Sequence, residues 1–122
     1  MRTRESEEMY LETIYLLSKT LPVVRSIDVA ADLGYAKPSV CRAIKLLQQR
    51  GYAKVNESGG IILTENGRKK AEGIFERHEV LTALFEKMGV NRQTAETDAC
   101  RIEHVISDEM FCAVKEFVRQ GK

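Results

Sequence analysis

Three potential metal ligands follow one another closely in the C-terminal third of the chain, in the order Cys100-x-x-Glu103-His104. On an α-helix, residues three and four apart share a face, so the thiolate, the carboxylate and the imidazole can point at one ion. His78 and Met9 offer two more ligand side chains from earlier segments. An ion bound by distant segments would tie them together, so metal binding would control the shape of the protein.

The ligand types favour some metals over others. The thioether of Met9 and the thiolate of Cys100 are soft ligands, which suit Fe(II), Co(II), Ni(II) or Zn(II), whereas Mn(II) prefers carboxylates and water. We expect Fe(II) in the cell. Zn(II) binds such sites more tightly on affinity order alone, so selectivity would depend on geometry and metal availability. Structural alternatives stay open: a lone cysteine is more often a buried small hydrophobe, Met9 fits core packing, and His78 fits a solvated helix position.

These ligands need elements to position them, and the first half of the sequence predicts three helices and two strands. Apolar residues at helical spacing predict a helix over residues 5–20, and a second short helix follows Ser26 as its N-cap and stops at Gly34. Pro38 opens a third helix, which is basic and ends near Gly51. Two short strands, 52–55 and 61–64, flank a Gly-containing turn. Residues 6–65 therefore fit a winged helix-turn-helix.

The second half is predicted to be entirely helical. A long amphipathic helix spans residues 66–87, another starts at Asn91 or Thr94 and holds the ligand cluster, and Ser107 caps a last one. Three helices are too few to enclose a core of normal depth, so we expect them to pack on the first helix and on a second copy of the chain. The predicted fold is mostly α, with a winged helix-turn-helix DNA-binding domain over residues 1–65 and a helical dimerisation and metal-binding domain over residues 66–122.

Composition limits the class of protein. The chain has 122 residues, of which 43% are hydrophobic and 30% charged, as expected for a folded globular protein. It shows neither a signal peptide nor a membrane span, so we expect a cytoplasmic protein without a membrane partner. Three cysteines without framework spacing indicate free thiols or ligands, and we expect Cys41 and Cys112 to serve packing.

Charge distribution indicates a double-stranded DNA partner more clearly than the net charge of +1 does. Residues 34–56 carry five Lys or Arg and no Asp or Glu. This basic block falls on the helix that a winged helix inserts into the major groove. Arg42 is our choice for reading a guanine edge, because a guanidinium can make two parallel hydrogen bonds to it. The other candidate DNA contacts, mostly to phosphates, are Lys37, Pro38, Ser39, Lys45 and Lys54.

With these features in place, residues 5–120 resemble the diphtheria toxin repressor (DtxR/MntR/IdeR) family of metal-dependent transcriptional regulators. The most specific motif is the run from Ala99 to Glu109, which is similar to the iron-sensing branch almost residue for residue. Four further motifs support it: Glu12-x-Ile14-Tyr15, Pro38-Ser39-Val40, Leu63-Thr64-x-x-Gly67 and Arg77-His78-Glu79.

The resemblance implies a ligand set. One site would use Met9, Cys100, Glu103 and His104, and a neighbouring site would use His78. In that second site the iron branch has a Glu where Thr82 stands and a His where Glu96 stands, so Glu96 is a substitute ligand. Glu12 corresponds to a ligand of the manganese branch, which has Asp and Glu at the positions of Met9 and Cys100. Many iron-sensing members also carry an SH3-like domain after the dimerisation helices, whereas this sequence ends at Lys122 and resembles the shorter two-domain architecture.

The sequence thus predicts a metal-activated repressor that binds operator DNA as a homodimer, with the metal, Fe(II) by preference, as corepressor. A manganese-responsive regulator of the same family is the first alternative. A zinc metalloenzyme with Glu12 or Glu79 as base is less favoured, because no separate substrate domain is predicted. A third alternative is a winged-helix interaction module whose metal is structural, in which case a chelator would unfold the protein.

Overall fold

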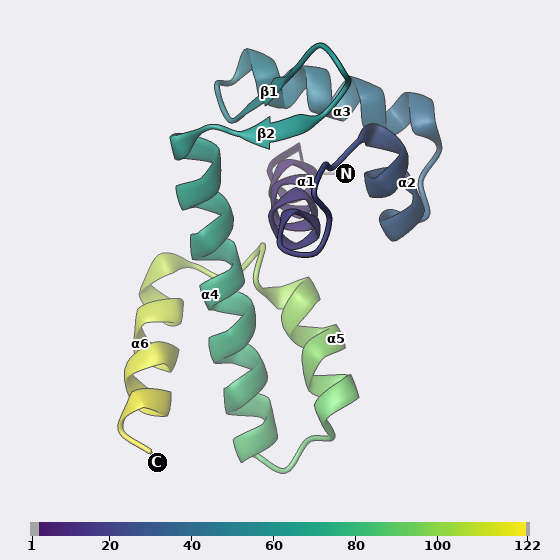
Figure 1. Ribbon diagram of the computed structural model, residues 1–122. Coiled ribbons are helices and arrows are strands. Elements are labelled where there is room, and N and C mark those ends of the chain that lie inside the picture. Colours follow the sequence, from purple (N-terminus) through teal and green to yellow (C-terminus); the bar gives the residue numbers. More distant parts are fainter. Residues whose placement is uncertain (1–2, 122) are drawn as a thin grey trace. The chain divides into compact units, whose positions relative to one another are not determined.

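The computed structural model describes residues 3–121, which form six α-helices and one β-hairpin (Figure 1). Two compact units share them, one ending at Glu72 and the other beginning at Gly73, inside the longest helix. The predicted boundary at residues 65/66 stays a prediction. The elements are α1 (Thr3–Ser18), α2 (Ser26–Leu33), α3 (Lys37–Gln49), β1 (Ala53–Val55), β2 (Ile61–Leu63), α4 (Glu65–Lys87), α5 (Arg92–Ile102) and α6 (Asp108–Arg119).

The first unit is a winged helix-turn-helix, as predicted. α1 packs against α2, α3 and β2, and α3 packs in turn against α2 and β1 (Figure 1). The turn between α2 and α3 passes through Gly34, whose φ of +73° is left-handed and ends α2. The core is the shared apolar face of these helices and the inner face of the hairpin: Leu11, Ile14, Val29, Val40, Leu47, Ala53 and Ile61 are all buried.

The wing is a short antiparallel hairpin in which Lys54 pairs with Ile62. Asn56 organises its turn, because its Oδ1 accepts hydrogen bonds from the backbone N–H groups of Ser58 (3.1 Å) and Gly60 (2.8 Å). The N–H of Ile61 donates to the Val24 carbonyl at 2.7 Å and joins the wing to the segment after α1. The hairpin therefore has a defined position beside α3.

The start of α4 explains a glycine in the Leu63-Thr64-x-x-Gly67 motif. Thr64 Oγ1 donates to the Gly51 carbonyl at 2.7 Å and accepts from the Gly67 N–H at 3.1 Å, so Thr64 caps α4. A Cβ at position 67 would lie 2.0 Å from the Tyr52 carbonyl oxygen. Only glycine allows this close approach of the helix to the residue before the wing.

The second unit contains the rest of α4 together with α5 and α6. Asn91 caps α5 through its side-chain oxygen, and Ser107 caps α6 by accepting from the Met110 N–H at 3.0 Å. Its buried apolar residues are few: Ile74, Leu81, Ala95, Ala99 and Phe111. On α6, Met110 and Phe117 are about half exposed, at 55% and 48%.

Several expectations need correction. Ser26 is the first residue of α2 and not its N-cap; the cap is Arg25, whose N–H donates to the Asp28 carboxylate at 2.9 Å. Cys41 and Cys112 are exposed, so the prediction that they pack in the core of the chain is wrong. Within residues 3–121, no helix has the length and apolar character needed to cross a membrane.

Candidate metal centre and nucleic-acid interface

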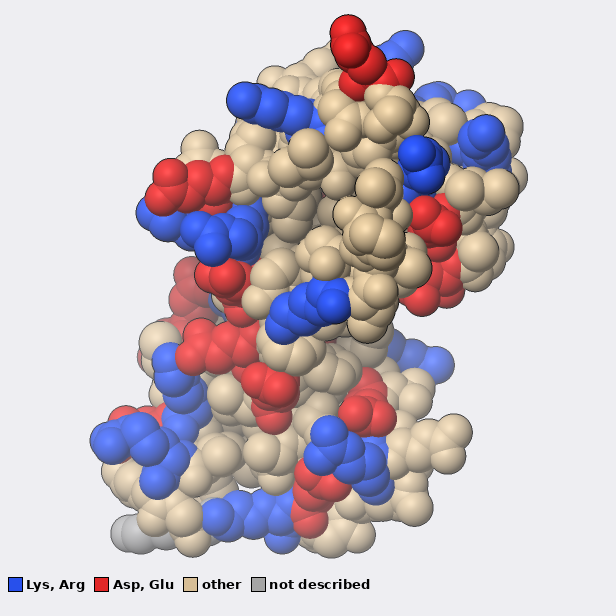
Figure 2. Space-filling model, in the orientation of Figure 1, with Lys and Arg blue, Asp and Glu red and all other residues tan. Residues whose placement is uncertain are grey.

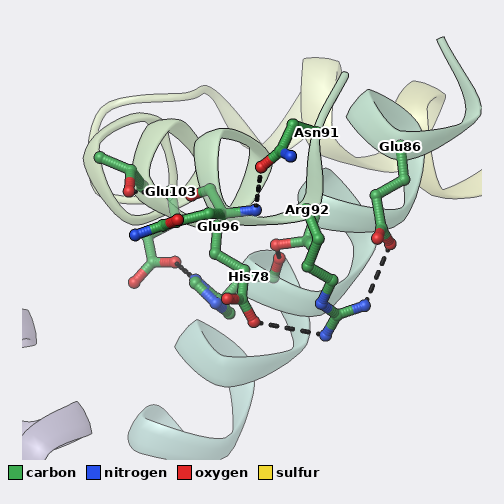
Figure 3. A network of polar contacts seen from close by, with 9 residues as sticks. His78, Glu86, Asn91, Arg92, Glu96 and Glu103 are labelled. Atoms are coloured by element: carbon green, nitrogen blue, oxygen red, sulfur yellow. Dashed lines mark hydrogen bonds and ion pairs between the residues drawn. The ribbon is translucent and has the colours of Figure 1, made fainter. Parts of the chain in front are cut away.

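Glu103 is the central acidic residue of the candidate metal centre. α5 ends at Ile102, so Glu103 is its C-cap and His104 lies in the turn that follows, not on the helix as the spacing predicted. Glu103 keeps helical backbone angles and its N–H still donates to the Ala99 carbonyl at 2.9 Å. Its side chain is fully buried. One carboxylate oxygen lies 2.9 Å from His78 Nδ1 and the other 3.4 Å from His104 Nε2 (Figure 3 shows the first contact).

His78 lies on α4 and contacts Glu103, and neighbouring residues of the same helix position it. Its ring stacks on Phe75 with an interplanar angle of 13°. Thr82, at the position where the iron branch has a Glu, is buried, and its hydroxyl donates to the His78 carbonyl at 2.7 Å. The structure therefore brings three predicted ligands of the second unit together: His78, Glu103 and His104.

The two other predicted ligands on α5 lie differently. Cys100 is exposed, like the other two cysteines. Glu96 is about half exposed and its carboxylate lies 3.3 Å from the Arg92 guanidinium, which also pairs with Glu86 at 3.0 Å (Figure 3). In this conformation Glu96 belongs to a surface ion-pair network at the start of α5.

Met9 and Glu12 lie on α1, in the first unit. Glu12 is buried, with 8% of its surface exposed. Met9 is half-buried, and the Tyr35 hydroxyl points at its sulfur atom at 4.0 Å. Tyr35 lies two residues before the start of α3, so this ligand candidate touches the turn of the helix-turn-helix.

The donor set around Glu103 fits a divalent cation. A fully buried carboxylate is costly unless a cation or hydrogen bonds compensate it. Oε2 of Glu103 is buried and has no hydrogen bond from any residue in the described range, although it faces the His104 imidazole. Carboxylate and imidazole are ligands that Fe(II), Mn(II), Co(II) and Zn(II) all accept, so this pair does not select among them.

The candidate DNA contacts lie on the surface of the first unit. Arg42 is exposed on α3 and its guanidinium lies 3.3 Å from Ser39 Oγ, which is half-buried. The remaining four are exposed: Lys37, Pro38, Lys45 and Lys54. On the face shown in Figure 2, basic and acidic side chains are interspersed within each unit and do not form a continuous area of one sign.

Arg50, one of the five basic residues in the range 34–56, forms an ion pair with a buried acid, a role that was not predicted. Arg50, at the end of α3, has its Nε 2.6 Å from the Glu7 carboxylate, and Lys70 on α4 lies 3.1 Å from the same carboxylate. The Glu7 side chain is only 4% exposed. Burial lowers the pKa of Lys70, but its hydrogen bond and attraction to Glu7, with help from Tyr52, outweigh burial and leave that pKa raised. The signal in the sequence was an acid on the apolar face of α1, four residues before Leu11.

Comparison with known proteins decides the family. Residues 2–61 match the model described as iron dependent repressor, N-terminal DNA binding domain, and residues 64–122 match the iron dependent repressor, metal binding and dimerisation domain. The chain belongs to the iron-dependent repressor family. It is a metal-dependent transcriptional regulator and not an enzyme, which confirms that part of the functional prediction and removes the metalloenzyme alternative.

Individual relatives agree with this assignment. The repressor is 33% identical over 120 residues to an uncharacterised HTH-type transcriptional regulator of Methanocaldococcus jannaschii, covering 97% of this chain and 96% of that one. It is 32% identical over 117 residues to the transcriptional regulator MntR of Escherichia coli, covering 96% and 76%. A solved manganese-dependent transcriptional repressor in complex with manganese shares the fold, with a TM-score of 0.83 and 21% identity over 90% of this chain and 51% of that one.

Proposed function

We propose that this protein represses transcription by binding double-stranded operator DNA as a homodimer when a divalent metal, Fe(II) by preference, is bound. The ligands of the main site would be Met9, Cys100, Glu103 and His104, with Glu12 as a further carboxylate. His78 and Glu96 are the candidates for a second site. Such a repressor acts in the cytoplasm.

The observation that carries the proposal is the buried Glu103 carboxylate. Its Oε1 is bound by His78, and its Oε2 lies 3.4 Å from His104 with no hydrogen bond from the described residues. A cation accepted between Oε2 and the imidazole would compensate the cost of burying this charge. Met9 and Glu12 belong to the first unit and the other ligands to the second, so a shared ion would couple the DNA-binding domain to the dimerisation domain.

The DNA-binding part of the proposal concerns α3. Arg42 would read a base, and Lys37, Pro38, Ser39, Lys45 and Lys54 would contact the backbone, as in other winged helices. Bound metal would favour the arrangement of the two domains that fits successive major grooves, and by linkage DNA would raise metal affinity by the same factor. A change of Arg42 to Lys is expected to relax base preference at one position, at a cost of about 1–3 kcal/mol in discrimination.

The test is operator binding by the full chain, measured by gel shift with Co(II) or anaerobic Fe(II) and with a chelator. We expect strong binding only with metal. Glu103→Gln should lose the metal dependence, whereas Asp98→Asn, at an exposed position of α5, should keep it. Equal binding with metal and with chelator by the unmodified protein would refute the proposal.

A manganese-responsive repressor is the second candidate, and one observation favours it: Cys100 is exposed, whereas the oxygen donors Glu12 and Glu103 are buried. Oxygen donors suit Mn(II) better than a thiolate does. Absorption spectra of the Co(II) protein separate the two candidates, because a thiolate ligand gives a charge-transfer band in the near ultraviolet. We expect this band in the unmodified protein and not in Cys100→Ala; no band in either would favour manganese.

Thermal melting distinguishes a structural role for the metal from a sensing role. A sensor should stay folded without metal, because the first unit has its own buried core. A chelator that abolished the melting transition of the whole chain would instead indicate a structural metal.

A further inference from the structure

Arg77 on α4 contacts two carbonyl groups of the segment that joins α5 to α6, and the first residue of α6. One terminal nitrogen donates to the carbonyl oxygens of Ile106 (2.9 Å) and Glu103 (3.4 Å), and the other pairs with the Asp108 carboxylate. The guanidinium also lies over the Phe111 ring, 5.2 Å from its centroid. The Arg77 side chain is 16% exposed, so its contacts with the two carbonyl groups are partly shielded from water, whereas its Asp108 partner is 87% exposed.

The chemistry of the turn explains why an arginine stands there. The last carbonyl groups of a helix have no N–H partner within that helix, and at the end of α5 the turn amides of Val105 and Ile106 both donate to the Ile102 carbonyl. The Glu103 and Ile106 carbonyls are left for Arg77. A guanidinium can bond two carbonyls and a carboxylate at once, because its five N–H donors form a rigid plane; a lysine ammonium cannot match that geometry.

Two adjacent residues of α4 therefore hold Glu103 from different sides. Arg77 binds its backbone carbonyl and His78 binds its carboxylate. His104 follows directly in the same turn and is buried. We propose that Arg77 is a positioning residue of the metal centre, which fixes the turn so that Glu103 and His104 point at one cation. This inference rests on the proposed function of these two residues as ligands.

A simpler role for Arg77 would be to hold α4 and α6 together without influence on metal binding. The two roles differ in what they predict. A purely structural arginine would change the melting temperature when it is replaced, while the folded variant would bind metal with unchanged affinity. A positioning residue would change metal affinity in the folded protein, since groups that orient metal ligands typically contribute about 10–100-fold to affinity.

The experiment compares Arg77→Lys with Arg92→Lys in the full chain. Arg92 is a matched control, because it also pairs with two carboxylates in the second unit but is 66% exposed, and its partners within the described residues are Glu86 and Glu96 and not the turn. Co(II) affinity is measured from the visible absorption of the bound ion. We expect Arg77→Lys to weaken Co(II) binding about 10–100-fold and Arg92→Lys to leave it unchanged. In the metal-free protein, hydrogen exchange at the amides of Val105 and Ile106 should be faster only in Arg77→Lys.

Equal Co(II) affinity in the two variants would overturn the inference while leaving the proposed metal site intact. No Co(II) binding by the unmodified protein would overturn both. If Arg77→Lys does not fold, Asp108→Asn removes a single partner of Arg77 at a side chain that is 87% exposed. That variant should weaken Co(II) binding about threefold, and unchanged affinity would then refute the inference.

Discussion

Replacing Glu7 by glutamine should destabilise the DNA-binding unit by an amount that the structure allows us to estimate. The change removes the charge that Arg50 and Lys70 share, at a side chain that is 4% exposed. Breaking a fully buried ion pair costs about 3–5 kcal/mol. Here Arg50 is 50% and Lys70 29% exposed, so both cations regain water, and the loss is nearer that of a charged hydrogen bond. We therefore expect about 2 kcal/mol.

The assay is urea unfolding of the full chain followed by tyrosine fluorescence. The chain has no tryptophan, and its four tyrosines all lie before residue 53, so the signal reports the first unit. With a urea dependence of about 1–3 kcal/mol per molar, the midpoint for Glu7→Gln should fall by about 1 M. Glu65→Gln is the control, because Glu65 pairs with Lys69 at the surface, where such a pair contributes about 0.3–0.5 kcal/mol.

A midpoint for Glu7→Gln within error of that for Glu65→Gln would refute the reasoning. The cluster also predicts non-additivity. Lys70→Met and Glu7→Gln share one interaction, so the double variant should be less destabilised than the sum of the single variants, by about 0.5–3 kcal/mol. Additive effects would mean that burial, and not the ion pair, accounts for the loss.

Two further predictions concern a glycine and alkaline pH. Gly67→Ala should destabilise the first unit by about 1–3 kcal/mol in the same assay, because its Cβ would meet a backbone carbonyl at 2.0 Å. Gly73→Ala, in open space on the same helix, should instead stabilise the helix by up to about 1 kcal/mol, and equal effects at both positions would contradict the packing argument. Burial raises the pKa of Tyr10, and the pKa of Lys70 is raised by its acidic partner; in the unfolded chain the groups titrate near 10.0 and 10.5. Tyr10 and Lys70 both bind protons more tightly in the folded protein. Their contribution to stability is therefore complete below the unfolded pKa values and is lost as the pH rises through the higher pKa values of the folded state. The urea midpoint should fall as the pH rises above about 10, less so in Glu7→Gln, and an unchanged midpoint would show that neither group contributes.

The elements of this fold were predictable because local rules determine them. Helical spacing of apolar residues located α1, α3 and α4, and the glycine that follows α2 was identified as its end for the reason the structure shows, a left-handed φ of +73° at Gly34. Ser107 was predicted as a cap and Asn91 as one of two possible helix starts, and in the structure both side chains accept from nearby free amides. These contacts span four residues or fewer, so no tertiary structure is needed to infer them.

The site was predictable only in part. Spacing brought Glu103 and His104 together, but it did not show that α5 stops at Ile102, since the helical pattern continues across that point. Nor did spacing indicate that Cys100 would be exposed, because a thiol suits a buried and an outward position equally. The contact between His78 and Glu103 joins residues 25 apart, and contacts of that range follow from packing.

α4 carries residues of two separate polar clusters, one around Glu7 and one around Glu103, so their effects on stability and on metal binding can be tested separately. Lys70 binds the buried acid of the first unit, Glu7, and Arg77 with His78 holds the buried acid of the second, Glu103. The clusters share no residue, so their energies should add. A variant at Lys70 should change stability of the DNA-binding unit at unchanged Co(II) affinity, and a variant at Arg77 should do the reverse. If both variants changed both properties, the disturbance would be transmitted along α4 or through an ion shared with Met9 and Glu12 of α1, and the metal response of this repressor would then depend on the stability of the first unit as well as on the ligands.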